Sequence, residues 1–444
     1  MSFTRTLRAV SGAVLAGALV IGTAPAASAD YIRDGQWALN AFGAKDVWQQ
    51  STGKNVTVAV VDTGVDGSHP DLQGSVLPGK SFASGGGTAD RASGDSHGTA
   101  MAALIAGHGH GPNHADGIMG LAPGAKILPI KTKDSEGGVS TENGFAEPLR
   151  YAVDNGAKVV NMSFGGVSFD QREKEAIKYA LEKDVLIVAG TGNDGVGTPM
   201  YPAAAPGVLA VGAVAKDGQV WRKSNYGEHV RLLAPGEGIY SAGIGSKYRQ
   251  GDGTSDATAY VSAAAALVRS KFPDLTAGQV ANRLTKTAIT PDGKSGISTP
   301  SPKYGYGTIR PYRALTENIP AGSKYGPLKA PEVQDPTSAG NDGATPGKPG
   351  EQKASGSSGI GIPPIVIIGL VLVVIVVLLV VVIVVGRRKK NNGGPPPGGP
   401  GGYGGPGSPG GNIGYPPHQS GPYQQQPNPY GSYPSAPPAQ PPGQ

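Results

Sequence analysis

The sequence predicts an α/β domain with a doubly wound, mainly parallel sheet and helices on both faces, followed by one C-terminal transmembrane helix. Two observations predict the domain. Apolar strand patterns alternate with amphipathic helix patterns over residues 30–317, and reactive side chains stand at the ends of these predicted elements. A third observation predicts the transmembrane helix, because residues 365–385 contain only Ile, Val, Leu and a single Gly.

The first 29 residues have the pattern of a secretory signal peptide. Arg5 and Arg8 precede an apolar stretch, and the small residues at 27–29 form an A-x-A cleavage site. We therefore expect the chain to be exported and the mature protein to start near Asp30. An uncleaved N-terminal membrane anchor is the alternative.

Five short apolar runs predict the strands of the sheet. Each is rich in Val, Ile or Leu, as expected of parallel strands covered on both faces. The runs are Val56–Val61, Lys126–Ile130, Lys158–Met162, Val185–Ala189 and Val208–Val214. Between the runs, Asp170 with Glu173 predicts the N-cap of a helix over residues 171–183. Thr276 with Gln279 predicts the N-cap of another helix, which ends near residue 286.

The chain after the domain divides into three parts. Residues 318–364 are rich in Pro, Gly, Ser, Lys and Asp and predict a disordered linker. Residues 365–385 would span about 31 Å as a helix, which matches a hydrocarbon core of roughly 30 Å. The Arg-Arg-Lys-Lys cluster at 387–390 predicts that the C-terminal side is cytoplasmic. The protein is therefore expected to be a single-pass protein of the cell membrane with its folded domain outside.

Residues 386–444 form a Gly/Pro/Tyr-rich cytoplasmic tail. Beyond Lys390 the tail contains no charged side chain, so it cannot bury enough apolar surface to fold alone. Two hypotheses remain open for it: an inert tail, or one that binds a cytoplasmic partner through polyproline segments and its tyrosines Tyr403, Tyr415, Tyr423, Tyr430 and Tyr433.

Composition excludes several classes of function. The chain has 38 basic and 32 acidic residues, but the surplus lies at Arg5, Arg8 and residues 387–390, which leaves the domain neutral. We therefore expect no nucleic-acid partner. There is no cysteine, which excludes thiol catalysis, zinc–thiolate sites and disulfides. A domain of about 280 residues can rely on its core, because it buries roughly three quarters of its unfolded surface.

Three motifs carry the chemistry. Val-Val-Asp-Thr-Gly-Val-Asp (60–66) places Asp62 at the carboxyl end of the first predicted strand, where ligands bind in such sheets. His97 and Ser255 each begin a predicted helix rich in small residues. A serine hydroxyl needs a base such as imidazole, and the imidazole needs an acceptor on its other nitrogen. Ser255, His97 and Asp62 supply these three groups. The helix N-terminus at Ser255 points backbone N–H groups at a developing oxyanion.

These motifs, in the order Asp, His, Ser, resemble those of the subtilisin-like serine proteases, the S8 family, over about residues 37–317. The resemblance implies the subtilisin-like fold and a serine endopeptidase that acts through an acyl-enzyme. It implies Asp62, His97 and Ser255 as the catalytic triad and Asn193, in Ala-Gly-Thr-Gly-Asn-Asp-Gly (189–195), as the side-chain donor to the oxyanion.

The resemblance also implies where a peptide substrate binds. Ser163, Phe164 and Gly165 would pair with the substrate backbone as an added β-strand. One wall of the pocket for the residue before the cut would be formed by Gly190, Thr191 and Gly192. Met200 would lie at the base of that pocket and favour small side chains such as Ala.

Within this family the chain is similar to the mycosins, membrane-bound proteases of type VII secretion. The similarity rests on residues 260–277 and on the order signal peptide, protease, linker, helix. It implies polypeptide substrates and the subunits of a membrane secretion complex as partners. Two departures are the absence of cysteine, where mycosins usually carry disulfides, and the long polar tail.

Two other functions compete with an active protease. Relatives usually have an apolar residue where Asp256 follows the nucleophile, and Pro where Ala259 stands, which suggests a catalytically weak structural subunit of a secretion complex. A wall- or peptide-binding module is the second, although it would not need the four catalytic candidates together.

No cofactor is expected. Structural calcium occurs in many relatives, but no Asp-rich loop of this chain indicates it. His108, His110 and His114 form either a metal-binding H-x-H loop or, as we favour, a solvated loop.

Overall fold

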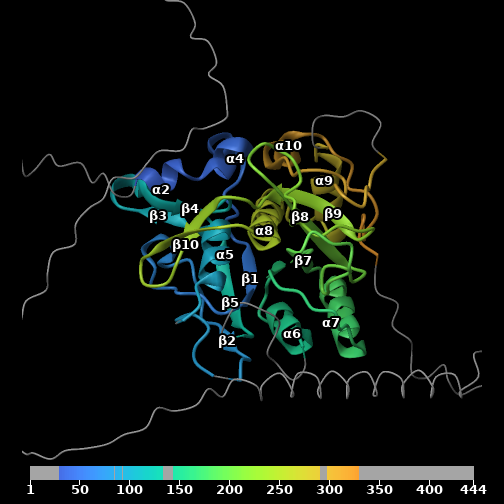
Figure 1. The fold of residues 1–444 in the computed structure, drawn as a ribbon, viewed down its shortest axis with the longest axis horizontal. Coiled ribbons are helices and arrows are strands. Elements are labelled where there is room, and N and C mark those ends of the chain that lie inside the picture. The colour runs from blue at the N-terminus through green and yellow to red at the C-terminus, as the bar shows by residue number, and fades with distance from the viewer. Residues whose placement is uncertain (1–29, 85, 93, 134–143, 291–297, 330–444) are drawn as a thin grey trace, which may run out of the picture. The chain divides into compact units, whose positions relative to one another are not determined.

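The computed structural model describes residues 30–84, 86–92, 94–133, 144–290 and 298–329 (Figure 1). The predicted signal peptide, the predicted transmembrane segment 365–385 and the tail lie outside the described residues, as does most of the predicted linker. Within the part that the structure describes, no helix combines the length and apolar character that crossing a bilayer requires.

A parallel seven-stranded sheet forms the centre of the domain (Figure 1). Every strand pair in this sheet is parallel. From one edge to the other the order is β2 (Lys80–Ser81), β5 (Lys126–Lys131), β1 (Thr57–Asp62), β6 (Val159–Met162), β7 (Leu186–Gly190), β8 (Val208–Val214) and β9 (Val230–Pro235). All five predicted strands are present, and β2 and β9 extend the sheet at its two edges.

Two pairs of helices cover the two faces of the sheet (Figure 1). The first pair is α5 (His97–Ala106) with α8 (Thr254–Lys271), and α8 packs across β1, β6, β7, β8 and β9. The second pair is α6 (Ala146–Asp154) with α7 (Gln171–Glu182). The predicted doubly wound α/β architecture is therefore confirmed. The buried helix α8 is apolar or small on almost every side, as a helix inside a core must be.

Both predicted helix starts are capping boxes. At α7 the Glu173 amide donates to Asp170 Oδ1 over 2.9 Å and the Asp170 amide donates to Glu173 Oε2 over 3.0 Å. At α9 (Ala277–Lys286) Thr276 and Gln279 exchange the same pair of bonds. Each box satisfies two N–H groups that the first helical turn leaves without an intrahelical acceptor.

Shorter elements complete the domain. The N-terminal segment forms α2 (Asp30–Asp34), α3 (Trp37–Phe42) and α4 (Ala44–Gln50). Two antiparallel hairpins pair β3 (His108–His110) with β4 (Asp116–Met119) and β10 (Ile239–Ala242) with β11 (Tyr248–Gly251). The remaining elements are the 3-10 turns η1 (Pro70–Leu72) and η2 (Pro112–His114) and the helix α10 (Pro311–Thr316).

The described chain stays packed on the domain beyond residue 318, where the sequence predicted the linker to begin. The chain continues along α9, where Asn282 Nδ2 donates to the carbonyl of Pro320 over 3.1 Å. Gly278 gives the chain room to approach, because a methyl group there would meet the backbone of Tyr325 at 2.1 Å. Leu328 is then buried against the core. The polar composition of residues 318–329 concealed this packing, since most of its contacts are made by backbone carbonyls.

Candidate active site

Asp62 is the last residue of β1, and its carboxylate is completely buried. Both oxygens face His97, whose Nδ1 lies 2.8 Å from Oδ1 and 2.9 Å from Oδ2, and Oδ1 also accepts the amide of Thr63 over 2.7 Å. Burial by itself raises the pKa of Asp62, but the charges of His97 and Lys133 and the hydrogen bonds from His97 and Thr63 outweigh it. The pKa of Asp62 therefore lies below its ordinary value, and the group is a carboxylate at neutral pH.

His97 begins α5, and close packing against the end of β1 fixes its place. The Gly98 amide donates to Thr63 Oγ1 over 3.0 Å, and the His97 amide donates to Asp95 Oδ1 over 2.7 Å. A methyl group at Gly98 would lie only 2.2 Å from the carbonyl oxygen of Gly64. Glycine is thus required for the imidazole to reach Asp62.

Ser255 stands in the first turn of α8, where backbone N–H groups point away from the helix. The Ser255 hydroxyl donates to the carbonyl of Ser163 over 3.4 Å. The Ser163 hydroxyl donates in turn to the carbonyl of Ser255 over 3.2 Å. These contacts join the start of α8 to the segment after β6, which is the predicted substrate-binding strand.

Asn193 is oriented by its amide oxygen. Oδ1 accepts both the backbone N–H and the hydroxyl of Thr254, each over 2.9 Å. The opposite NH2 group lies on the side of Gly253 and Ser255, since a methyl group on Gly253 would lie 3.5 Å from both Asn193 Nδ2 and the Ser255 amide nitrogen. The N–H groups of Asn193 and Ser255 therefore lie near each other at the start of α8, and a pair of such donors can stabilise an oxyanion.

A cavity of 510 Å³ brings most of the predicted residues together. Its lining includes His97, Ser163, Phe164, Gly165, Gly190, Gly192, Asn193, Met200 and Ser255, and it also includes Lys133, Asp194, Asp252 and Thr254. Asp62 lies behind His97 and does not line the cavity.

Met200 lies between Gly165 of the predicted substrate-binding strand and Gly192 of the predicted pocket wall. A methyl group on Gly165 would meet Met200 Cβ at 3.3 Å, and one on Gly192 would meet Met200 Cγ at 3.4 Å. The thioether side chain is therefore placed where it would limit the depth of a substrate pocket.

Thr191 does not line the cavity, although the sequence placed it in the pocket wall. It is fully buried, and its hydroxyl donates to the carbonyl of Asn225 over 3.1 Å. The alternation of side chains along an extended segment turns Thr191 away from the cavity while Gly190 and Gly192 face it. Thr191 therefore lies behind the wall of the cavity, where its hydrogen bond ties this segment to Asn225.

Asn225 is a residue that the sequence analysis missed. It is buried. Its Oδ1 accepts the backbone N–H groups of Asp194 and Val196 over 3.0 and 3.1 Å, and its own backbone N–H donates to the carbonyl of Gly192 over 3.0 Å. It thus holds the loop on both sides of Asn193. No local pattern identifies it, because the two segments meet only in the folded chain.

Lys133 was also missed. It is 3% exposed, it lines the cavity, and its ammonium lies 5.9 Å from the ring centre of Phe164. A signal did exist: Lys133 lies just after β5, at the same edge of the sheet where β1 ends at Asp62, and that edge is where ligands bind in such folds.

In the described part of the chain, which includes the histidine loop, no group of three or more His, Asp or Glu side chains is arranged so that it could hold a metal ion. Instead His110 Nδ1 pairs with the buried Asp71 Oδ1 over 2.6 Å, and the rings of His108 and His114 contact each other edge-on.

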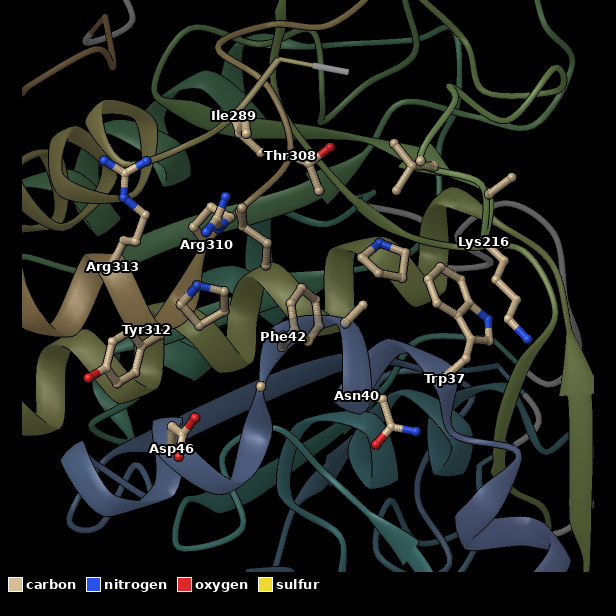
Figure 2. A pocket seen from close by; sticks show the side chains of 18 of the residues that line it. Trp37, Asn40, Phe42, Asp46, Lys216, Ile289, Thr308, Arg310, Tyr312 and Arg313 are labelled. Carbon is tan, nitrogen blue, oxygen red and sulfur yellow. The ribbon is translucent and has the colours of Figure 1, made fainter. Parts of the chain in front are cut away.

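A second cavity of 570 Å³ lies away from these residues (Figure 2). Figure 2 shows it between the helix that carries Trp37 and Phe42 and the segment that carries Arg310 and Tyr312. Its lining contains none of the residues nominated from the sequence. The chemistry described above belongs to the first cavity.

The chain is similar to known proteins over most of the described domain. The sequence pattern of the subtilase family, Peptidase S8, matches residues 53–307. The chain is similar to the thermophilic serine proteinase of Bacillus sp. (strain AK1), with 36% identity over 62% of this chain and 64% of that protein. It is similar to fervidolysin of Fervidobacterium pennivorans, with 35% identity over 64% of this chain and 44% of that protein. The chain thus spans less than two thirds of the length of either relative.

Among solved structures, the chain is similar to MycP1 from the ESX-1 type VII secretion system. The identity is 31% and the TM-score is 0.56, over 66% of this chain and 89% of that one.

Proposed function

This chain belongs to the subtilase family, and from that membership we propose that it is a serine endopeptidase that hydrolyses peptide bonds through an acyl-enzyme. One observation carries the proposal. The His97 imidazole is held through Nδ1 by the buried Asp62 carboxylate, 2.8 and 2.9 Å away, and shares one cavity with the Ser255 hydroxyl. A fixed, carboxylate-supported base beside a hydroxyl is the arrangement that activates a serine nucleophile.

Each residue has a defined step in the proposed reaction. Ser255 Oγ attacks the carbonyl carbon of the peptide bond while His97 Nε2 accepts its proton. The carbonyl oxygen becomes an oxyanion and receives hydrogen bonds from Asn193 Nδ2 and the Ser255 amide. His97 then protonates the leaving amine, and water, with its proton taken by His97, hydrolyses the acyl-enzyme. Asp62 remains a carboxylate and stabilises the imidazolium. No step requires a metal or cofactor.

The proposed peptide site is the cavity beside Ser255. The backbone of residues 163–165, which line the cavity, would pair with the substrate, and Gly190 and Gly192 leave space for the side chain before the cut. Met200 at the base of the cavity supports a preference for small side chains.

For the location of the protein, we propose export by residues 1–29, a membrane helix at 365–385, an extracellular protease domain and a cytoplasmic tail. The likeness to MycP1 supports a proposed place beside the subunits of a type VII secretion complex.

A catalytically weak structural subunit is the second candidate. The observation that favours it is Asp256, a buried carboxyl group directly after Ser255. A negative charge there would oppose a developing oxyanion.

A fluorophosphonate probe decides between the two candidates, because labelling needs an activated hydroxyl and an oxyanion site but no knowledge of the substrate. We expect the full-length protein to be labelled at Ser255 and Ser255→Ala to remain unlabelled. His97→Ala and Asp62→Asn should be labelled far more slowly. Asn193→Ala should retain labelling that is about 10²- to 10³-fold slower, because the Ser255 amide remains as a donor. A folded wild-type protein that stays unlabelled would favour the structural subunit.

A further inference from the structure

Asp256 is an acidic side chain buried at the start of the helix that carries the nucleophile. It follows Ser255 in the first turn of α8 and is 2% exposed. Its Oδ1 is buried and has no hydrogen-bond partner among the described residues. An ionised carboxylate normally accepts several hydrogen bonds, and burying one with an unsatisfied oxygen is costly. The site is therefore better suited to a neutral carboxyl group.

The carboxyl group of Asp256 lies beside the two oxyanion donors. A methyl group placed on Gly253 would be 3.5 Å from each of three atoms: Asn193 Nδ2, the Ser255 amide nitrogen and Asp256 Oδ2. No two of these atoms can therefore be further apart than twice that distance. At this range a charge on the buried Asp256 acts on any charge that builds up between the donors.

The groups around Asp256 do not compensate for its burial. Burial raises its pKa, and the charge of Asp252 in the preceding loop acts in the same direction. The charges of Arg249 on β11 and of His97 on α5, together with the Asp256 amide, lower the pKa but only in part. The result is a pKa of about 6. On α8 itself Tyr260 faces the same group, and burial together with the charge of Asp256 raises the pKa of Tyr260.

We propose that Asp256 is a proton-dependent positioning residue of the active site: its neutral form permits negative charge to develop at the oxyanion donors, and its ionised form opposes it. This inference rests on the proposed peptidase function. His97 must be deprotonated to accept the Ser255 proton, whereas Asp256 must be protonated. Activity is therefore lost as Asp256 ionises with rising pH, so Asp256 sets the falling limb of the pH profile.

Asp256→Asn tests the inference, because it keeps the shape of the side chain and removes its charge. We expect the labelling rate of the full-length wild type by the fluorophosphonate to rise and then fall as pH increases. The rate of Asp256→Asn should rise and reach a plateau, at least about 10-fold above the wild type at mildly alkaline pH, which corresponds to about 1.4 kcal/mol of activation free energy. Asp274→Asn, an exposed carboxylate beyond the other end of α8, serves as the control and should keep the wild-type profile.

A second measurement does not depend on activity. A raised pKa means that the folded state favours the protonated carboxyl, so the contribution of Asp256 to stability is present at low pH. That contribution is lost as pH rises from the unfolded pKa through the folded one. The thermal midpoint of the wild type should therefore fall relative to that of Asp256→Asn over this range.

The outcomes separate the two proposals. Labelling of both proteins with superimposable pH profiles, or loss of labelling only in Asp256→Asn, overturns the role of Asp256 and leaves the peptidase function intact. Parallel thermal midpoints of the two proteins across the pH range also overturn that role. Absence of labelling in both proteins at every pH overturns the peptidase function and, with it, the inference.

Discussion

Individual side chains of the site are held by groups that take no part in the proposed reaction. Asn193 illustrates this, because Thr254 holds its oxygen and so directs its NH2 group toward Ser255. Behind the loop, Asn225 binds the amides on one side of Asn193 and the carbonyl on the other. An oxyanion donor is effective only when it is already in place before charge develops, and these contacts provide that placement.

Met200 is the residue whose replacement should change specificity. In the wild type its side chain fills the space between Gly165 and Gly192, so a peptide library should show a preference for small residues, such as Ala, before the cut. Met200→Gly removes the thioether and should improve kcat/KM for a large apolar residue at this position by about 10-fold or more. The rate with Ala at this position serves as the internal control. A wild-type preference for Phe or Tyr would contradict the proposed depth of the pocket.

At the scale of elements, the position of α5 against β1 decides whether His97 meets Asp62. Gly98→Ala should displace the start of α5, because the added methyl group would lie 2.2 Å from the carbonyl oxygen of Gly64, an atom of the backbone. We expect a labelling rate by the fluorophosphonate reduced by about 10²-fold, since a displacement of about 1 Å can cost that much.

A stability variant provides the control for Gly98→Ala. Asp170→Ala removes the cap of α7 and should lower the free energy of unfolding by about 1 kcal/mol without altering the labelling rate of the folded protein. Thermal unfolding of both variants separates the two effects. The role assigned to Gly98 is wrong if its variant keeps the wild-type labelling rate.

At the scale of the whole molecule, the distribution of charge bears on topology. The surplus of basic residues lies at two places. Arg5 and Arg8 lie at the start of the proposed export signal, and residues 387–390 follow the proposed membrane helix. A protease added to intact cells should therefore cleave the linker within residues 330–361 and spare the tail beyond Arg387. Mass spectrometry of the released and retained fragments checks this, with permeabilised cells as the control in which the tail is cut. Digestion of the tail from outside intact cells would contradict the orientation.

The sequence by itself determined most elements of the domain and nominated the residues of the candidate site. Apolar runs predicted five strands of the sheet, and two capping boxes predicted where α7 and α9 begin. The ends of predicted elements nominated Asp62, His97 and Ser255. The predictions of strands and helix starts succeed because strand patterns and helix caps depend on neighbours along the chain.

Only the tertiary structure decided which distant segments meet. It placed Asn225 behind the loop of Asn193, buried Lys133 in the cavity, turned Thr191 away from it and packed residues 318–329 on α9. It also formed α6, which contains Pro148. Proline disfavours a helix interior, but Pro148 lies in the first turn, where the backbone N–H has no intrahelical acceptor. Hydrophobic periodicity specifies which face of an element is buried, but not the partner that covers it. The tertiary structure likewise decides which segments surround Asp256, and these surroundings determine whether its carboxyl group is charged.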